Sequence, residues 1–125
     1  WKGVIYAYNL ENAEELWQYD TKQDAVYAWN NAVQAAPVIS GNSIYFAGRS
    51  SRVYSLNKDS GIKNWVYVSP TNQWLIGGIL IKDGFIYLGS SDQRFFLALE
   101  AASGELQWQT LVIFVHVVHN VSTMI

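Results

Sequence analysis

The side chains in this sequence that could do chemistry are carboxylates, amides and two histidines. Asp59, Asp83 and Asp92 lie in polar stretches near expected turns, and so does Asn72. A calcium loop places its oxygen ligands at fixed, short spacings, and these residues do not show such a spacing. We therefore interpret them as solvated turn residues and predict no catalytic carboxylate among them.

His116 and His119 lie three residues apart in a segment rich in β-branched residues. Such residues favour strands, and two strand residues three apart point to opposite faces. The histidines could share a metal ion only on a helix, so we predict no metal site. The triplet Asn120-Val-Ser122 matches a glycosylation acceptor, a pattern that is common by chance. Gly77-Gly78 lacks the Lys-Ser or Lys-Thr of a phosphate loop, so we interpret it as a strand entry.

Composition excludes several classes of partner and site. Half of the 125 residues are hydrophobic, and 8 Lys and Arg stand against 10 Asp and Glu, for a net charge of -2. This chain lacks the positive charge that attracts nucleic acid, so we expect no nucleic-acid partner. No stretch reaches the roughly 18 uninterrupted apolar residues of a membrane helix, so we also expect no membrane span. The absence of Cys excludes disulfides and thiolate metal sites.

Three copies of one pattern organise the chain. They run from Ile5 to Trp17, from Val53 to Trp65 and from Phe96 to Trp108. Each copy begins with strand-forming residues, passes through a polar turn and ends at a tryptophan. The turns of the second and third copies contain Gly61 and Gly104, where the first copy has Ala13. Glycine adopts a positive φ without steric cost, so we expect a hairpin in every copy.

The spacing of the copies predicts an all-β fold built of β-propeller blades. Tyr45 and Tyr87 lie 42 positions apart, and Trp65 and Trp108 lie 43 apart. This period is typical of blades, which are antiparallel sheets of four strands. We expect the second half of a blade at 1–20, a loop at 21–35, whole blades at 36–68 and 77–110, and an atypical apolar tail at 111–125. The chain would then be a partial propeller of about two and a half blades.

The two later copies resemble the propeller repeat of the pyrroloquinoline-quinone family. The segments Tyr54-Ser-Leu-Asn-Lys-Asp-Ser-Gly-Ile-Lys-Asn-Trp65 and Leu97-Ala-Leu-Glu-Ala-Ala-Ser-Gly-Glu-Leu-Gln-Trp108 are similar to the family pattern Tyr-Ala-Leu-Asp-Ala-x-Thr-Gly-x-x-x-Trp. The resemblance extends over residues 4–110. It implies that the blade-end tryptophans wedge against the next blade, and so assigns a structural docking role to Trp17, Trp65, Trp108, Gly61 and Gly104. A WD repeat is a weaker match, because Asp follows none of these tryptophans.

The resemblance also bears on cofactors. Dehydrogenases of this family bind the quinone and a calcium ion on the propeller axis, with a catalytic Asp and often a vicinal disulfide. Other members, such as a propeller lipoprotein of the bacterial outer-membrane protein assembly machinery, have the repeats without using the cofactor. Because this chain has no Cys and no calcium-loop spacing, we predict no cofactor. Quinone with calcium remains the alternative.

Two groups of residues are candidates for contact with a protein partner. Tyr27 and Trp29 lie in the loop expected between blades, where insertions commonly form a binding face. Arg49, Arg52 and Arg94 lie in or beside turns between second and third strands, and Arg is favoured at interfaces. The structural alternatives are packing over a sheet edge for the aromatic pair and ordinary solvated turns for the arginines.

These observations favour a non-catalytic scaffold for protein partners in the cell envelope, with an extracytoplasmic location. One alternative is a segment of a quinone- and calcium-dependent alcohol or sugar dehydrogenase, and another is an extracytoplasmic sensor domain. A partial propeller cannot close on itself, because closed propellers have four to eight blades. We therefore expect further blades, either from the same longer chain or from an oligomer.

Overall fold

The computed structural model describes residues 3–24, 32–91 and 94–111. Within these ranges the regular structure is almost entirely β strand. The first sheet is a hairpin of β1 (Val4–Tyr8) and β2 (Glu15–Asp20), followed by the short 3-10 helix η1 (Thr21–Asp24). The middle sheet contains β3 (Val38–Ser40), β4 (Ser43–Ala47), β5 (Arg52–Asn57) and β6 (Lys63–Val68). The last sheet contains β7 (Leu80–Lys82), β8 (Phe85–Gly89), β9 (Phe95–Glu100) and β10 (Leu106–Leu111).

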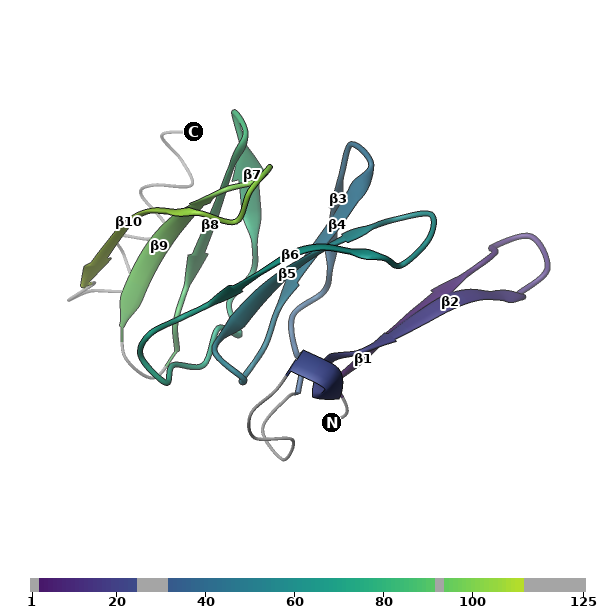
Figure 1. The fold of residues 1–125 in the computed structure, drawn as a ribbon, viewed down its shortest axis with the longest axis horizontal. Coiled ribbons are helices and arrows are strands. Elements are labelled where there is room, and N and C mark those ends of the chain that lie inside the picture. Colours follow the sequence, from purple (N-terminus) through teal and green to yellow (C-terminus); the bar gives the residue numbers. More distant parts are fainter. Residues whose placement is uncertain (1–2, 25–31, 92–93, 112–125) are drawn as a thin grey trace.

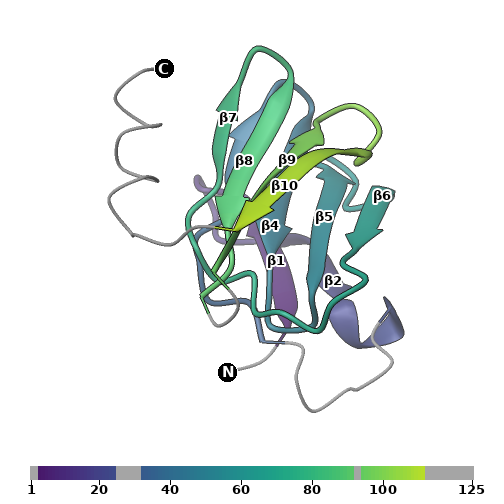
Figure 2. The same ribbon diagram turned by 90° about the vertical axis from the view of Figure 1, so that its left-hand side faces the viewer.

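Each sheet is an antiparallel meander in which every strand pairs with its neighbour in sequence. The three sheets follow one another across Figure 1, with the hairpin at one side and the sheet of β7 to β10 at the other. Figure 2, turned by 90°, looks onto the last sheet with the other sheets behind it. The predicted all-β architecture with four-stranded antiparallel sheets is confirmed.

The core lies in two layers between the sheets, and the alternation of strand side chains supplies both layers from one sheet. On β5, Tyr54 and Leu56 face the hairpin and pack with Ile5 and Tyr19. Val53, on the opposite face of the same strand, belongs to the layer shared with the last sheet. The middle sheet is therefore covered on both faces, which explains why β5 is buried at nearly every position, the polar Arg52 and Ser55 included.

The link between β6 and β7 is tied to the turn between β4 and β5. Ser51 has a φ of 62° there, and its hydroxyl accepts from the backbone N–H of Gln73 at 2.9 Å. The Ser51 carbonyl accepts from the N–H of Ser69 at 2.9 Å, and the Gly48 carbonyl accepts from that of Leu75 at 3.2 Å. These bonds hold the link against the middle sheet and bury Leu75 completely in the second core layer.

In the described part of the chain no helix has the length and hydrophobicity needed to cross a bilayer.

Truncation of a core leucine tests the second layer. Leu97 is completely buried between the middle and last sheets, so Leu97→Ala should lower the free energy of unfolding by about 2–5 kcal/mol. The matched control is Leu10→Ala, because Leu10 is 99% exposed in the first hairpin turn and its loss should change stability by less than about 0.5 kcal/mol. Urea denaturation followed by circular dichroism measures both, and equal losses would contradict the assigned core.

Candidate functional site

A β-bulge precedes each blade-end tryptophan. In the register of the hairpin, Trp17 pairs with Ala7 and Glu15 with Tyr8, so Leu16 has no partner across the strand. The same skip leaves out Asn64 before Trp65 and Gln107 before Trp108. A bulge places two residues opposite one and turns the strand locally, which re-aims the following side chain. The three tryptophans are thus positioned by one repeated backbone device.

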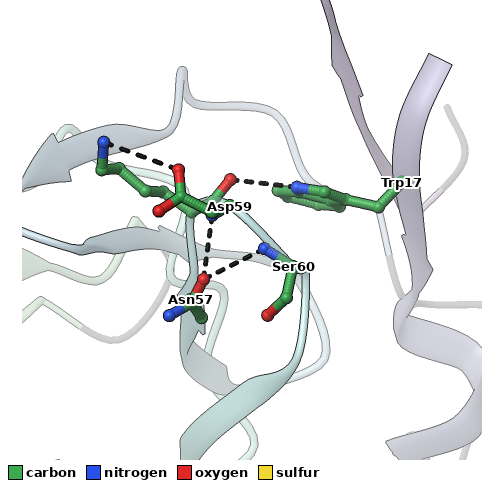
Figure 3. A network of polar contacts seen from close by, with 5 residues as sticks. Trp17, Asn57, Asp59 and Ser60 are labelled. Atoms are coloured by element: carbon green, nitrogen blue, oxygen red, sulfur yellow. Dashed lines mark hydrogen bonds and ion pairs between the residues drawn. The ribbon is translucent and has the colours of Figure 1, made fainter.

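Trp17 on β2 lies against the turn between β5 and β6 in the next sheet (Figure 3). Its indole Nε1–H donates to the Lys58 carbonyl at 2.9 Å. The ring covers Gly61, which has a φ of 71°, and a Cβ built on Gly61 would lie only 2.6 Å from the ring atom Cδ2. We call the contact of Trp17 with Gly61 and Lys58 the first seam. Only glycine fits this position, for its φ and for the space.

The second seam repeats the first between the middle and last sheets. Trp65 on β6 donates its indole Nε1–H to the Ala101 carbonyl at 3.0 Å. A Cβ built on Gly104, which has a φ of 76°, would lie 2.6 Å from Cδ2 of the Trp65 ring. In both seams the accepting carbonyl belongs to the residue three positions before the glycine. The two contacts are therefore one interaction used twice.

The side chain of Asn57 shapes the turn that receives Trp17. Its Oδ1 accepts from the backbone N–H of Asp59 at 2.9 Å and from that of Ser60 at 3.0 Å (Figure 3). Asn is favoured in such turns because its side chain bonds to the backbone just ahead of it. Lys58 and Asp59 form an ion pair with a separation of 3.7 Å, but both side chains are exposed, so the pair adds little. These bonds between the Asn57 side chain and the backbone hold the turn in the shape that presents the Lys58 carbonyl.

Trp108 on β10 occupies the equivalent place on the last sheet and is 44% exposed. Its ring contacts Tyr87 and Phe96, with centroids 6.1 and 5.8 Å away. Tyr87 and Phe96 also line a cavity of about 500 Å³, together with Gly77, Gly78 and neighbouring residues. Within the described ranges, Trp108 faces no turn of a further sheet. The last sheet thus presents an aromatic and apolar face.

The three arginines lie in different surroundings. The Arg49 guanidinium stacks over the Trp74 ring at 4.5 Å, and its Nε donates to the side chain of Gln34 at 2.8 Å. Arg52 is only 8% exposed and donates to the Ser50 carbonyl, so most of its side chain is unavailable to a partner. Arg94 is exposed beside β9. The turns therefore do not present the three arginines as one rim.

The described residues do not offer a calcium site. Asp59 and Asp83 are exposed in separate turns, and no three His, Asp or Glu residues of the described ranges come together in a group that could hold a metal. Calcium needs six to eight oxygen ligands, so these residues do not fit the ion. The candidates Tyr27, Trp29, Asp92, His116, His119 and Asn120 lie outside the described residues.

A polar cluster that sequence reasoning missed joins the hairpin to the middle sheet. The Tyr19 hydroxyl donates to the Asp24 carboxylate, which also forms an ion pair with the Lys63 ammonium at 2.7 Å. Burial acts to raise the pKa of Asp24, but the hydrogen bonds from Lys63 and Tyr19 and the positive charge of Lys63 outweigh it and lower the pKa. Asp24 and Lys63 are far apart in sequence, and neither belongs to a motif, so no sequence signal pointed to the pair.

Glycine-to-alanine substitutions test the second seam. Gly104→Ala should destabilise the fold both through its positive φ and through the clash of the new Cβ with the Trp65 ring. Gly84→Ala should add only the backbone strain of a positive φ, because nothing lies within 4 Å of its new Cβ. Each substitution should cost about 1 kcal/mol in backbone strain, and Gly104→Ala about 1–3 kcal/mol more through overpacking. Urea denaturation compares the two variants. Equal costs would mean that the Trp65 ring is not held against this turn.

The ion pair of Asp24 should make stability depend on pH. A folded-state pKa below the unfolded value means that the ionised carboxylate stabilises the fold above about pH 4, and that this contribution is lost as the pH falls through the folded pKa. Asp24→Asn should therefore lower the free energy of unfolding at pH 6, and the difference from the unaltered protein should shrink towards pH 3. Urea titrations across this range measure the difference, with Asp83→Asn as the control for losing an exposed turn carboxylate. A difference that stays constant with pH would exclude the ion pair.

Comparison with known proteins places this arrangement in a family. The family model described as outer membrane protein assembly factor BamB matches residues 2–114. Outer membrane protein assembly factor BamB of Escherichia coli strain K12 is 32% identical over an alignment of 84 residues, and the match covers 61% of this chain and 21% of that protein. The protein of the same name from Salmonella typhimurium strain LT2 is 33% identical over 84 residues. The match thus spans about a fifth of the length of these relatives.

Solved structures share the fold at lower identity. The crystal structure of BamB from Moraxella catarrhalis superposes with a TM-score of 0.69 and 18% identity, covering 89% of this chain and 31% of that one. A europium-containing methanol dehydrogenase gives a TM-score of 0.70 at 17% identity, covering 86% and 21%. Quinohemoprotein alcohol dehydrogenase from Comamonas testosteroni gives 0.68 at 16% identity, covering 86% and 18%. The predicted propeller fold and the resemblance to the quinone-type repeat are confirmed, and the chain belongs to the family described as outer membrane protein assembly factor BamB.

Proposed function

We propose that the chain is a propeller segment that serves as a non-catalytic scaffold for protein partners in the assembly of outer-membrane proteins. The observation that carries this proposal is the family match over residues 2–114, since that family is described by such an assembly factor. Its identity to the assembly factors, 32% with the Escherichia coli protein, supports the same proposal. The dehydrogenases reach only 16–17%, so their likeness concerns the fold alone. An extracytoplasmic location is part of the proposal.

The tryptophan seams supply the rigid frame that a scaffold needs. We assign Trp17 with Gly61 and Trp65 with Gly104 to docking between blades, because each indole bonds to the turn of the next sheet and leaves no room there for a Cβ. Trp108 has the same place on its sheet and an exposed ring. Its face is suited to a further blade, from a longer chain or from another copy.

In this proposal the module works without quinone or calcium, since the described carboxylates do not fit the ion. The surface left for partners includes the exposed Arg94 and the partly exposed Arg49, whose guanidinium is already stacked on Trp74. Tyr27 and Trp29 remain predictions. The segment of a quinone-dependent dehydrogenase is the second candidate, favoured by the shared fold of the two dehydrogenase structures.

Site-specific cross-linking tests the scaffold. A photoreactive amino acid replaces Arg94 in the chain exported to the periplasm of Escherichia coli, and mass spectrometry identifies the proteins that it captures. We expect cross-links to components of outer-membrane protein assembly. The same photoreactive residue at the exposed Asp83, in the turn between β7 and β8, is the control for chance encounters.

A titration with pyrroloquinoline quinone and Ca²⁺ separates the second candidate from the first. The scaffold proposal expects no saturable change in quinone absorbance and no dye-linked alcohol oxidation. Saturable binding with turnover would overturn it in favour of the dehydrogenase.

In the cross-linking experiment, cross-links of the same strength from Arg94 and from Asp83 would show that the Arg94 region has no specific partner.

A further inference from the structure

The two seams share the indole contact but differ in the polar contacts beside it. At the first seam, η1 follows the hairpin and brings the Asp24 carboxylate to 2.7 Å from the Lys63 ammonium on β6. This ion pair joins the end of the hairpin to the middle sheet. At the second seam the place of Lys63 is taken by Leu106, since each lies two positions before the blade-end tryptophan of its sheet. The equivalent ion pair cannot form there, because leucine has no charge.

Asp24 faces two cations at this junction. Arg52 on β5 is only 8% exposed, and its guanidinium donates to the Ser50 carbonyl at 2.9 Å. The positive charges of Lys63 and Arg52 both act on the Asp24 carboxylate, which also accepts from the Tyr19 hydroxyl. The Asp24 side chain is 13% exposed, so solvent screens these charges less than it would at an open surface. Neutralising Asp24 would remove the negative charge that both cations face, and a buried cation without a counter-ion is costly.

The other ionisable groups around Asp24 leave the response to acid to this carboxyl group. Burial raises the pKa of Tyr54 to about 12, and burial together with the bond to Asp24 raises the pKa of Tyr19 further, so both hydroxyls stay neutral in acid. Residues 25–31 contain no acidic or basic side chain. The remaining charged groups that face or flank the junction are Lys63, Arg52, Asp20 and Lys22. The cations keep their charge as the pH falls, and Asp20 is exposed.

We propose that the first seam is an acid-sensitive joint that the charge of Asp24 holds closed, whereas the second seam stays closed in acid. Below about pH 4, a proton on Asp24 ends the ion pair with Lys63, and the hairpin with η1 separates more often from the middle sheet. Trp17 leaves the Gly61 turn in each such opening. Both seams lie between sheets that the structure describes, so the joint does not depend on what covers the outer faces or on the proposed scaffold function.

The direction of the effect follows from the contacts of the carboxyl group. Burial alone would raise the pKa of Asp24, but its bonds to Lys63 and Tyr19 hold the pKa below the unfolded value. The stabilisation of the joint is therefore complete above about pH 4 and is lost as the pH falls through the folded-state pKa. The turn that receives Trp65 also has a carboxylate, Glu100, but this accepts from Ser103 within the same turn and joins no second sheet.

Hydrogen exchange of the two docked indoles tests the proposal in the intact protein. NMR follows the Nε1–H groups of Trp17 and Trp65 from pH 6 to pH 3, and the variants Trp17→Phe and Trp65→Phe assign the signals. Protection is expressed relative to free tryptophan at the same pH, which removes the pH dependence of exchange itself. The protection of Trp17 should fall about tenfold further than that of Trp65, as expected when one hydrogen bond to a charged group is lost.

Two variants separate the charge of Asp24 from acid in general. Asp24→Asn should reproduce the acid state at pH 6, with about tenfold less protection of Trp17 and no change at Trp65. The matched control is Asp59→Asn, which removes an exposed carboxylate from the turn that receives Trp17 and should leave both indoles as they were. Circular dichroism verifies that the variants fold, and the pH series of the unaltered protein needs no variant of Asp24.

Two results would overturn the proposal. One is a parallel loss of protection at Trp17 and Trp65 as the pH falls, which would mean that acid loosens the whole structure rather than one joint. The other is an Asp24→Asn protein in which Trp17 is as well protected at pH 6 as in the unaltered protein, which would mean that the ion pair does not hold the hairpin in place.

Discussion

The structure depends on an indole ring that lies on a glycine in a left-handed turn and donates its N–H to a carbonyl in that turn. A four-stranded sheet cannot bury both of its own faces, so neighbouring sheets must be held at a fixed distance and angle. The indole supplies a large apolar surface and one directional bond, and the glycine lets the ring approach the backbone. The ring of Trp17 or Trp65 sets how closely two sheets approach, and the apolar layers behind the rings fill the space.

The requirements of this contact explain why several residue types recur around it. The bulge before each tryptophan aims the ring. The skipped position takes residues of different types, and its three occupants are the exposed Leu16, Asn64 and Gln107. The turn needs a residue that tolerates positive φ and a carbonyl that points at the indole. The positions that vary among the copies are those that the indole contact does not constrain. Ala13 stands at the glycine position of the first copy, whose turn has no indole over it among the described residues, and it keeps a positive φ of 58°.

The sequence revealed those features that repeat. The tryptophans, the turn glycines and the alternating strands occur in two or three copies, so their spacing alone predicted the sheets and their order along the chain. The ion pair of Asp24 with Lys63 occurs once and joins residues 39 apart, so no pattern could reveal it. Arg52 was a candidate for contact with a protein partner because arginine is favoured at interfaces, but it follows Ser51 into a strand that is buried on both faces. Burial of a charged residue depends on the neighbouring sheets, which the local sequence does not describe.

The meander of each sheet has a consequence for the order in which the chain folds. Every strand bonds to the next one along the chain, so a sheet can complete itself from a short, continuous stretch of polypeptide. The indole bonds, in contrast, join residues 41 and 36 positions apart and close larger loops. Loop closure costs more entropy as the loop lengthens, so local pairing should precede the contacts between sheets. A chain that emerges gradually, from the ribosome or across a membrane, can thus form its sheets one after another and join each to the preceding one as it appears.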